Sequence, residues 1–348
     1  MTDGLGGRAD LAKPGRSRHH PPMLHLFGPG CSTDPVDPSK IRSVPDGAVW
    51  LDLFEPTRQE EALAEKVLGG NIPTRDEMVE IEPSSRLYER GGAVFMTMSV
   101  LHGIDENDPA SDPVSFILTD KHLVTIRYVD PKPFKLFGDH CRAEPELVSS
   151  STGAFIRLVD AIVSRQADVI ESVGRTIENV STHVFRRRQP GTDRRSTDRL
   201  EALILKIGRI QTLLARIRET SVSTTRLLSF LDSTDLADHD RSKAHVHLHS
   251  LIADSAALSD QANFLSDNLT FLLDAALGLI GVEQNMVMKI WSVVAVVLMP
   301  PTLVAGIYGM NFEHIPELKW LYGYPYALVV MLVSAVLPYW IARKKGWL

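Results

Sequence analysis

Two long uncharged runs near the C-terminal end constrain the fold of this chain more than any other feature. Residues 290–308 (IWSVVAVVLMPPTLVAGIY) and 324–342 (YPYALVVMLVSAVLPYWIA) contain no Asp, Glu, Lys or Arg. Each run has about 19 residues, which as a helix measure about 29 Å, the thickness of the hydrocarbon core of a bilayer. The sequence therefore predicts two transmembrane helices, joined by an external loop at 309–323.

Basic residues set the expected orientation of these helices. Arg343, Lys344 and Lys345 follow the second run directly, so the positive-inside rule places the basic tail 343–348 in the cytoplasm. Two crossings then place the N-terminus in the cytoplasm as well. Residues 1–23 lack the apolar core of a signal peptide and are expected to form a disordered tail. The expected location is the cell inner (plasma) membrane, as a multi-pass protein.

Composition excludes several classes of function. The 348 residues include 37 Lys and Arg against 43 Asp and Glu, a net charge of −6 that argues against a nucleic-acid partner. The two cysteines, Cys31 and Cys141, lie far apart, so neither a disulfide scaffold nor a Cys-based zinc site is supported. No phosphate-binding glycine loop, nucleophile motif or metallohydrolase pair occurs, so we expect no enzyme and no organic cofactor.

Residues 24–150 have the mixed pattern of an α/β domain. The segment AVWLDLF at 48–54 predicts a buried strand, and a helix is expected to follow it, capped by Thr57 and ended by Gly69-Gly70. Further elements are expected as a short helix capped by Thr74, a strand at 93–101, and a hairpin that turns at 119–121.

Beyond residue 150 the apolar spacing becomes helical. Residues 151–239 predict an antiparallel helical hairpin that Pro190-Gly191 interrupts, and residues 240–289 predict a stalk helix. No proline occurs in the stalk before Pro300, so one helix can run from the stalk into the first apolar run. The predicted fold class is an α/β cytoplasmic domain plus a long α-helical stalk and two C-terminal transmembrane helices.

The first apolar run carries one unusual face. Alternate steps of three and four residues reach small, polar or methionine side chains, and such a 3.5-residue repeat is the seam along which helices of an oligomer meet. One interpretation is close packing through small residues, below which an acidic, solvated face begins. The other is a polar pore with a carboxylate-ringed cytoplasmic vestibule, which predicts cation selectivity. The stripe is Asn285, Met288, Ser292, Ala295, Met299, Thr302, Gly306 and Gly309, with Asp260, Asp267 and Asp274 below it.

The residues that follow the first run make this pattern specific. The segment YGMNF at 308–312 precedes EHIPELKW at 313–320, and the second run ends in ARKKGWL. This arrangement resembles the CorA family of divalent-cation transporters, whose hallmark is Gly-Met-Asn after the first of two C-terminal spans. The resemblance implies a CorA-like, funnel-shaped homopentamer in the lipid bilayer. It also implies inward movement of Mg²⁺, with Co²⁺ and Ni²⁺ as further candidates, and gating by cytoplasmic Mg²⁺.

The resemblance also assigns roles to individual residues. Gly309, Met310 and Asn311 would form the selectivity filter, where a ring of five Asn amide oxygens can hold a hydrated Mg²⁺ without trapping it. Ser250 occupies the place of a regulatory Asp in some members, which makes Asp254 a substitute candidate for binding regulatory metal. Other positions that match the family are Asn285, Met288, Met299 and Thr302 as pore lining, Trp291 as an unusually large residue at a constriction, Asp274 as a pore-facing acid, and Glu313 and Glu317 as the acidic external loop.

Two alternatives stay open at this point. A zinc transporter of the ZntB branch shares Gly-Met-Asn, and His314 is the residue that favours it, although the stripe offers oxygen and thioether ligands but no His or Cys. A membrane-anchored cytoplasmic binding or signalling protein would need no polar stripe in its anchor. The cluster His245, His247 and His249 is interpreted as a solvated surface or as a transition-metal site that lacks obvious further ligands.

Overall fold

The computed structural model describes residues 24–29, 31, 36–37, 43–80, 82, 86–106, 108–185, 196–234, 243–310 and 320–345. These residues belong to two compact units, which we describe separately: unit 1 is Met1–Asn179 with Leu205–Leu269, and unit 2 is Val180–Ile204 with Thr270–Leu348. The mixed α/β domain, the long helices and the two apolar C-terminal helices confirm the predicted fold class.

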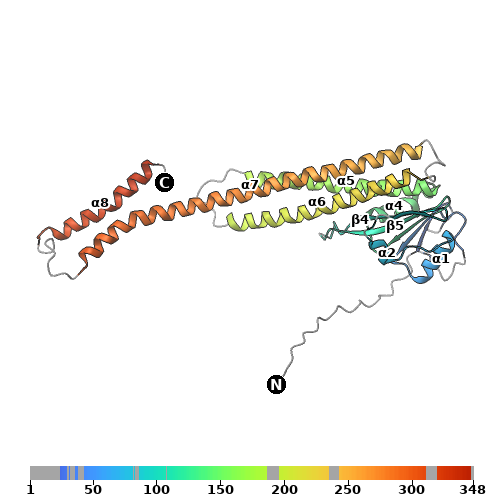
Figure 1. Ribbon diagram of the computed structural model, residues 1–348, viewed down its shortest axis with the longest axis horizontal. Coiled ribbons are helices and arrows are strands. Elements are labelled where there is room, and N and C mark those ends of the chain that lie inside the picture. Colours follow the sequence, from blue (N-terminus) through green and yellow to red (C-terminus); the bar gives the residue numbers. More distant parts are fainter. Residues whose placement is uncertain are drawn as a thin grey trace, which may run out of the picture. The chain divides into compact units, whose positions relative to one another are not determined.

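The elements follow one another in a simple order (Figure 1). The N-terminal part contains β1 (Leu24–Phe27), β2 (Trp50–Phe54), α1 (Arg58–Leu68), α2 (Arg75–Val79), β3 (Leu87–Arg90), β4 (Ala93–His102), β5 (Ala110–Leu118), β6 (Leu123–Arg127), α4 (Lys132–Ala143) and the 3-10 turn η2 (Pro145–Val148). The helical part contains α5 (Ser151–Phe185), α6 (Ser196–Asp232), α7 (Lys243–Tyr308) and α8 (Gly323–Lys344).

Unit 1 is built on a six-stranded sheet with the order β1-β2-β6-β5-β4-β3. Strands β2 and β6 pair in parallel, and the other neighbours pair in antiparallel fashion. Strand β4 is buried on both faces, so its side chains alternate between two cores: Met96 and Met98 face one, and Phe95 faces the other.

Different helices cover the two faces of this sheet. On one face Leu63 of α1 and Met78 of α2 complete the smaller core. On the other face Phe155 of α5, Leu228 of α6 and Leu251 of α7 join the larger core, so the unit 1 parts of these three helices pack on the sheet. The core of unit 1 therefore fixes the start of α7, the helix that later carries the polar stripe.

The two predicted capping residues are confirmed in detail. Thr57 Oγ1 accepts a hydrogen bond from the Glu60 amide at 3.4 Å, and the Glu60 carboxylate accepts one from the Thr57 amide at 2.7 Å. Thr74 and Glu77 form the same capping box at the start of α2. Helix α1 ends at Gly69, whose φ of 67° is the left-handed conformation that glycine adopts readily.

Helix α4 was not predicted from the sequence. Its segment KPFKLFGDHCRA contains a proline and a glycine, which lower helix propensity. Packing overrides this, because Phe134, Phe137 and Cys141 share one face and are buried. The Phe137 ring lies 5.3 Å from the ring of Trp50. The two cysteines are free, as predicted.

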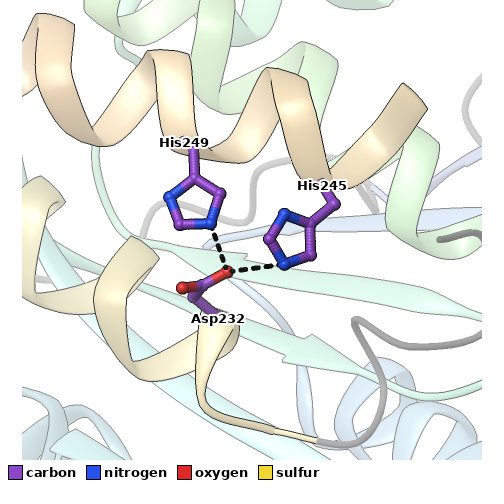
Figure 2. Close-up of side chains that lie close together, drawn as sticks. All are labelled: Asp232, His245 and His249. Atoms are coloured by element: carbon purple, nitrogen blue, oxygen red, sulfur yellow. Dashed lines mark ion pairs between the residues drawn. The ribbon is translucent and has the colours of Figure 1, made fainter. Parts of the chain in front are cut away.

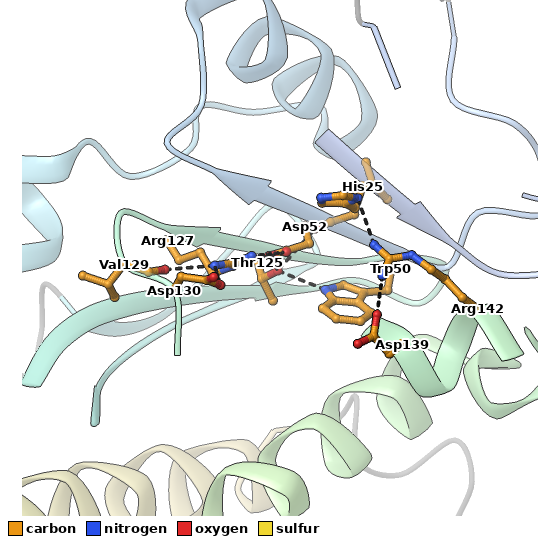
Figure 3. Close-up of polar contacts among 10 residues, drawn as sticks. His25, Trp50, Asp52, Thr125, Arg127, Val129, Asp130, Asp139 and Arg142 are labelled. Carbon is orange, nitrogen blue, oxygen red and sulfur yellow. Dashed lines mark hydrogen bonds and ion pairs between the residues drawn. The ribbon is translucent and has the colours of Figure 1, made fainter. Parts of the chain in front are cut away.

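A buried polar chain links β2 to β6 (Figure 3). Arg127 Nη2 donates to Asp52 Oδ2 at 2.9 Å, and Arg127 Nε donates to Asp52 Oδ1 at 3.1 Å. Trp50 donates to Thr125 Oγ1 at 3.0 Å, and Thr125 in turn donates to Asp52 Oδ1 at 2.7 Å. Burial alone would lower the pKa of Arg127, but the Asp52 charge and hydrogen bonds outweigh it and raise that pKa.

Candidate functional site

Helix α7 carries most of the residues that the sequence singled out. It is continuous from Lys243 to Tyr308, and its 66 residues correspond to about 99 Å of helix. Its buried residues recur at three and four: Leu248, Leu251, Ser255, Ala262, Leu265, Leu269, Leu272 and Ala276. Among the later described residues of α7 only Val293 is buried, so the packed stripe ends near Ala276.

The predicted vestibule carboxylates lie on the opposite face of α7. Asp260, Asp267 and Asp274 each stand two residues before a buried position, which is about 200° around the helix. All three side chains are exposed. In the described chain this face therefore meets none of the core.

Two phenylalanines also lie on this acidic face and were not predicted from the sequence. Phe264 and Phe271 continue the three-and-four spacing between the carboxylates, and their side chains are 63% and 61% exposed. The Phe271 ring lies 6.3 Å from the Phe185 ring. Large exposed aromatic groups indicate a surface that meets a partner. Their spacing could have revealed them, because they occupy the other half of the same heptad repeat.

The predicted pore stripe is exposed along its whole length. Met288 and Met299 of the stripe are 67% and 70% exposed, and Trp291, the large residue next to the stripe, is 69% exposed. Ser292 Oγ donates to the Met288 carbonyl at 2.8 Å, and Thr302 Oγ1 donates to the Leu298 carbonyl at 2.8 Å. Each hydroxyl oxygen thus keeps its lone pairs available as an acceptor. The remaining stripe residues are exposed too: Asn285, Ala295, Gly306 and Gly309.

Part of this stripe lines a shallow groove on α7. Ala295, Met299, Thr302 and Gly306 lie along it, and Met310 extends it past the end of the helix. Leu298, Leu303 and Ile307 complete its lining. The structure thus places four predicted pore residues and one predicted filter residue along one continuous face.

Gly309 follows the last residue of α7 directly and lies in a turn, and its backbone is not in the left-handed region. Its amide donates to the Ala305 carbonyl at 2.9 Å, and a Cβ at Gly309 would lie 3.0 Å from that oxygen. A side chain at this position would therefore push the Ala305 carbonyl oxygen aside by a few tenths of an ångström. The predicted filter residue Asn311 and the loop residues Glu313 and Glu317 lie outside the described residues.

Asp254, the candidate for regulatory metal binding, is exposed on α7. It accepts a hydrogen bond from Ser250 Oγ at 3.4 Å, one helical turn away. Ser250, at the position of the family's regulatory Asp, and Asp254, its substitute candidate, are therefore neighbours on one face of α7.

The two C-terminal helices expose more apolar surface than a protein in water normally does. Both α7 and α8 contain windows long and apolar enough to cross a membrane, and 6% and 11% of those windows are buried. Exposed side chains on α8 include Leu332, Val336 and Trp340. Contiguous apolar surface of this extent requires lipid or further protein around it.

The chain thus combines an α/β domain with two helices that are long and apolar enough to cross a membrane, the architecture of a membrane protein. The family model described as CorA-like Mg²⁺ transporter protein matches residues 45–344. The chain belongs to this family, which is one of transporters rather than enzymes.

Curated relatives agree with this assignment. The chain is 33% identical over 305 residues to the magnesium transport protein CorA of Pasteurella multocida, covering 87% of this chain and 93% of the relative. It is 30% identical over 302 residues to the protein of the same name from Escherichia coli strain K12, covering 86% of this chain and 92% of the relative.

Solved structures share the fold. The CorA magnesium transporter of Methanocaldococcus jannaschii aligns over 93% of this chain and 98% of its own, with a TM-score of 0.73 and 19% identity. The full-length CmaX protein aligns over 95% of this chain and 100% of its own, with a TM-score of 0.66 and 14% identity. The cytoplasmic domain of ZntB from Vibrio parahaemolyticus aligns over 74% of this chain and 98% of its own, with a TM-score of 0.52 and 10% identity. At these identities the structures establish the fold and do not separate the magnesium from the zinc branch.

One further cluster of possible metal ligands was predicted only in part, since the sequence pointed to its histidines but not to its third residue. His245 and His249 were expected to lack a third ligand, but Asp232 at the end of α6 lies beside both (Figure 2). No sequence pattern indicates this contact, because Asp232 belongs to another helix, α6.

Proposed function

We propose that this protein moves Mg²⁺ into the cytoplasm through a pore on the axis of a homopentamer, with Co²⁺ and Ni²⁺ as further substrates. The observation that carries the proposal is the polar stripe on α7, which continues the acidic face of the stalk without a break in the helix. A helix that served only as an anchor would need no such face.

Exposure of the stripe supports assembly. Asn285 and Thr302 are exposed in the single chain, and Thr302 lines the groove that runs from Ala295 to Met310; polar groups in such positions would be costly if they faced lipid. Arranged around an axis, five copies of α7 would turn these groups toward water and their apolar faces toward lipid or α8. The exposed Phe264 and Phe271 would meet neighbouring copies in the same arrangement.

The spacing of the stripe supports coiling of these helices. Positions 260 and 309 are seven heptads apart, and a straight helix drifts by about 20° per heptad. A straight α7 would therefore turn its stripe by about 140° between Asp260 and Gly309. A left-handed supercoil removes this drift, so we expect the α7 helices to wind around one another.

The filter chemistry suits Mg²⁺. This ion demands octahedral oxygen coordination and gives up water reluctantly. Five Asn311 amide oxygens would offer neutral acceptors to a hydrated ion, and neutral groups bind weakly enough to release it. The approach of Gly309 to the Ala305 carbonyl supports a compact pore mouth at this level. Glu313 and Glu317 would raise the local cation concentration outside.

The cytoplasmic end of the pore would be strongly negative. Asp260, Asp267 and Asp274 would each contribute a ring of five carboxylates, since all three lie exposed on the face that continues the stripe. The protein would lie in the inner (plasma) membrane with both termini on the cytoplasmic side. An inside-negative potential of about 100 mV would then supply about 4.6 kcal/mol for each divalent ion that enters. No other energy source is then required.

Gating would follow from the same charges. Mg²⁺ held between neighbouring cytoplasmic domains, with Asp254 as a candidate ligand, would screen carboxylates and keep the pore closed. Loss of Mg²⁺ would let them repel one another. Limited proteolysis with and without Mg²⁺ tests this idea, and identical digestion patterns would contradict it.

The deciding experiment is ion uptake into liposomes that contain the purified protein. An inside-negative potential is imposed, and Mg²⁺, Co²⁺ and Zn²⁺ entry are compared for the wild type, Asn311→Ala and Val297→Ala. Val297 is the matched control because it stands two residues from both Ala295 and Met299, about 200° from the stripe. We expect Mg²⁺ entry in the wild type and in Val297→Ala, and none in Asn311→Ala.

Other outcomes of this experiment would replace the proposal. Zn²⁺ entry without Mg²⁺ entry would assign the protein to the zinc branch, for which His314 remains the supporting residue. Absence of flux for every ion would favour the anchored binding protein. Equal Mg²⁺ flux in wild type and Asn311→Ala would retain transport and refute the Asn ring.

A further inference from the structure

We propose that Asp232, His245 and His249 form a binding site for a first-row transition-metal ion such as Zn²⁺, separate from the transport path. The three residues come from two helices: Asp232 is the last residue of α6, and the histidines lie in the first turns of α7. Figure 2 shows both imidazole rings directed at one carboxylate oxygen.

The distances fit a shared ion better than direct hydrogen bonds. Nε2 of His249 lies 3.5 Å from Asp232 Oδ1, and Nε2 of His245 lies 3.7 Å from the same oxygen. Both separations exceed an ordinary hydrogen bond. Ligand atoms at the vertices of a tetrahedron around Zn²⁺, bonded at about 2.0–2.1 Å, stand about 3.3 Å apart. Small side-chain rotations would therefore bring these atoms onto one ion.

The carboxylate oxygen supplies a second, independent observation. Asp232 Oδ1 is buried and accepts no hydrogen bond from any residue that the structure describes. A buried carboxylate oxygen that accepts no hydrogen bond is costly, and a bound cation would remove that cost. The two histidine rings, 4.5 Å apart and four residues apart in sequence, form the rest of the ligand set.

The ligand chemistry selects the class of ion. Imidazole nitrogen binds Zn²⁺, Ni²⁺ and Cu²⁺ well, whereas Mg²⁺ prefers oxygen ligands only. The site would therefore respond to transition metals in the presence of excess Mg²⁺. It lies wholly in unit 1, whereas the filter and pore stripe belong to unit 2, so the two sites share no residue.

His247 provides a matched control within the same helix. It stands two residues from both His245 and His249, about 200° around α7, and its Nε2 lies 3.8 Å from Asp160 Oδ2 instead. Side chains of His245, His247 and His249 are 42%, 48% and 54% exposed, so replacement of each by Gln should leave the fold intact.

The test is equilibrium Zn²⁺ binding to the purified full-length protein in a saturating Mg²⁺ background, which occupies oxygen-rich sites. We expect the wild type and His247→Gln to bind one more Zn²⁺ per chain than Asp232→Asn, His245→Gln or His249→Gln. At this site each of the last three changes should weaken binding at least about a hundredfold, since even outer-shell changes cost ten- to a hundredfold.

A spectroscopic measurement keeps the test independent of the amount of protein that folds. Co²⁺ added in place of Zn²⁺ should give visible absorption bands of nitrogen-bound Co²⁺ in the wild type and in His247→Gln, but not in the three ligand variants. Equal Zn²⁺ affinity and equal Co²⁺ spectra in all five proteins would refute the site. Loss of binding in His247→Gln would refute the ligand set.

Discussion

Removal of the buried carboxylate at Asp52 should destabilise unit 1 more than any change of a surface ion pair. The side chains of Arg127 and Asp52 are 6% and 4% exposed, and Asp52 accepts from Arg127 Nε and Nη2. Asp52→Asn leaves the guanidinium charge buried with only part of its acceptors. Breaking a buried pair by removal of one partner costs about 3–5 kcal/mol.

The surroundings of Arg127 place the expected cost near the lower limit. Arg127 Nη1 still donates to Asp130 Oδ1 at 2.7 Å and to the Val129 carbonyl at 2.9 Å, so the charge keeps one partner. About 3 kcal/mol corresponds to a fall in Tm of about 6–12 °C for a domain of this size. The assay is thermal unfolding of the full chain in detergent, followed by tryptophan fluorescence at one fixed scan rate.

A double variant tests whether the loss of stability comes from the unpaired charge of Arg127. Asp52→Leu with Arg127→Met replaces both charges by apolar groups and should regain most of the lost Tm. Thr125 Oγ1 lies 3.5 Å from the Leu51 carbonyl and would keep an acceptor there. Glu171→Gln, which breaks the exposed pair with Arg175, is the control and should leave Tm unchanged. If Asp52→Asn changed Tm no more than Glu171→Gln, the argument from burial would fail.

Three further predictions concern the pore mouth, the stalk and a buried thiol. Gly309→Ala should lower Mg²⁺ flux in the liposome assay without changing the oligomer, because its Cβ would lie 3.0 Å from the Ala305 oxygen; unchanged flux would mean that the mouth rearranges freely. Phe264→Ser with Phe271→Ser should weaken assembly in native mass spectrometry, since both exposed rings are expected to meet other copies; an intact oligomer would place its contacts elsewhere. Cys141 should resist alkylation near neutral pH until the protein unfolds, because burial raises its pKa to about 12 and leaves almost no thiolate; rapid labelling, located by peptide mapping, would contradict this.

Local signals in the sequence predicted part of the fold well. The caps at Thr57 and Thr74 were predictable because each depends on a Glu three residues later, and the strand at β2 because it is a short apolar run. Helix α4 was missed because its propensity is poor and its stability comes from contacts with Trp50, distant in sequence. The sequence therefore predicted a helix or strand correctly where residues close by in the chain determine it.

The same distinction between local and distant contacts applies to the predicted sites. The stripe was predictable since one helix, α7, carries it from Asn285 to Gly306, and a helical period orders such residues without tertiary contacts. The contact of Asp232 with His245 and His249 was not predictable, because it depends on how the end of α6 meets the start of α7. The close approach of Gly309 to the Ala305 carbonyl oxygen was also not predictable, since it depends on the backbone geometry at the end of α7.

A last prediction follows from the continuity of α7. Within one unbroken helix, the angle around the axis between the buried stripe and the predicted pore stripe depends only on the number of residues between them. The buried stripe ends at Ala276 and the pore stripe begins at Asn285 within one helix, so their angular relation is fixed by residue count. One Ala inserted after Gly281 would turn everything downstream by about 100°, whereas seven inserted residues would turn it by only about 20°. We expect the single insertion to abolish Mg²⁺ flux and the seven-residue insertion to retain it, although the longer insertion disturbs more of the chain. Flux that survived the single insertion, or that failed equally in both, would show that this register does not govern the pore.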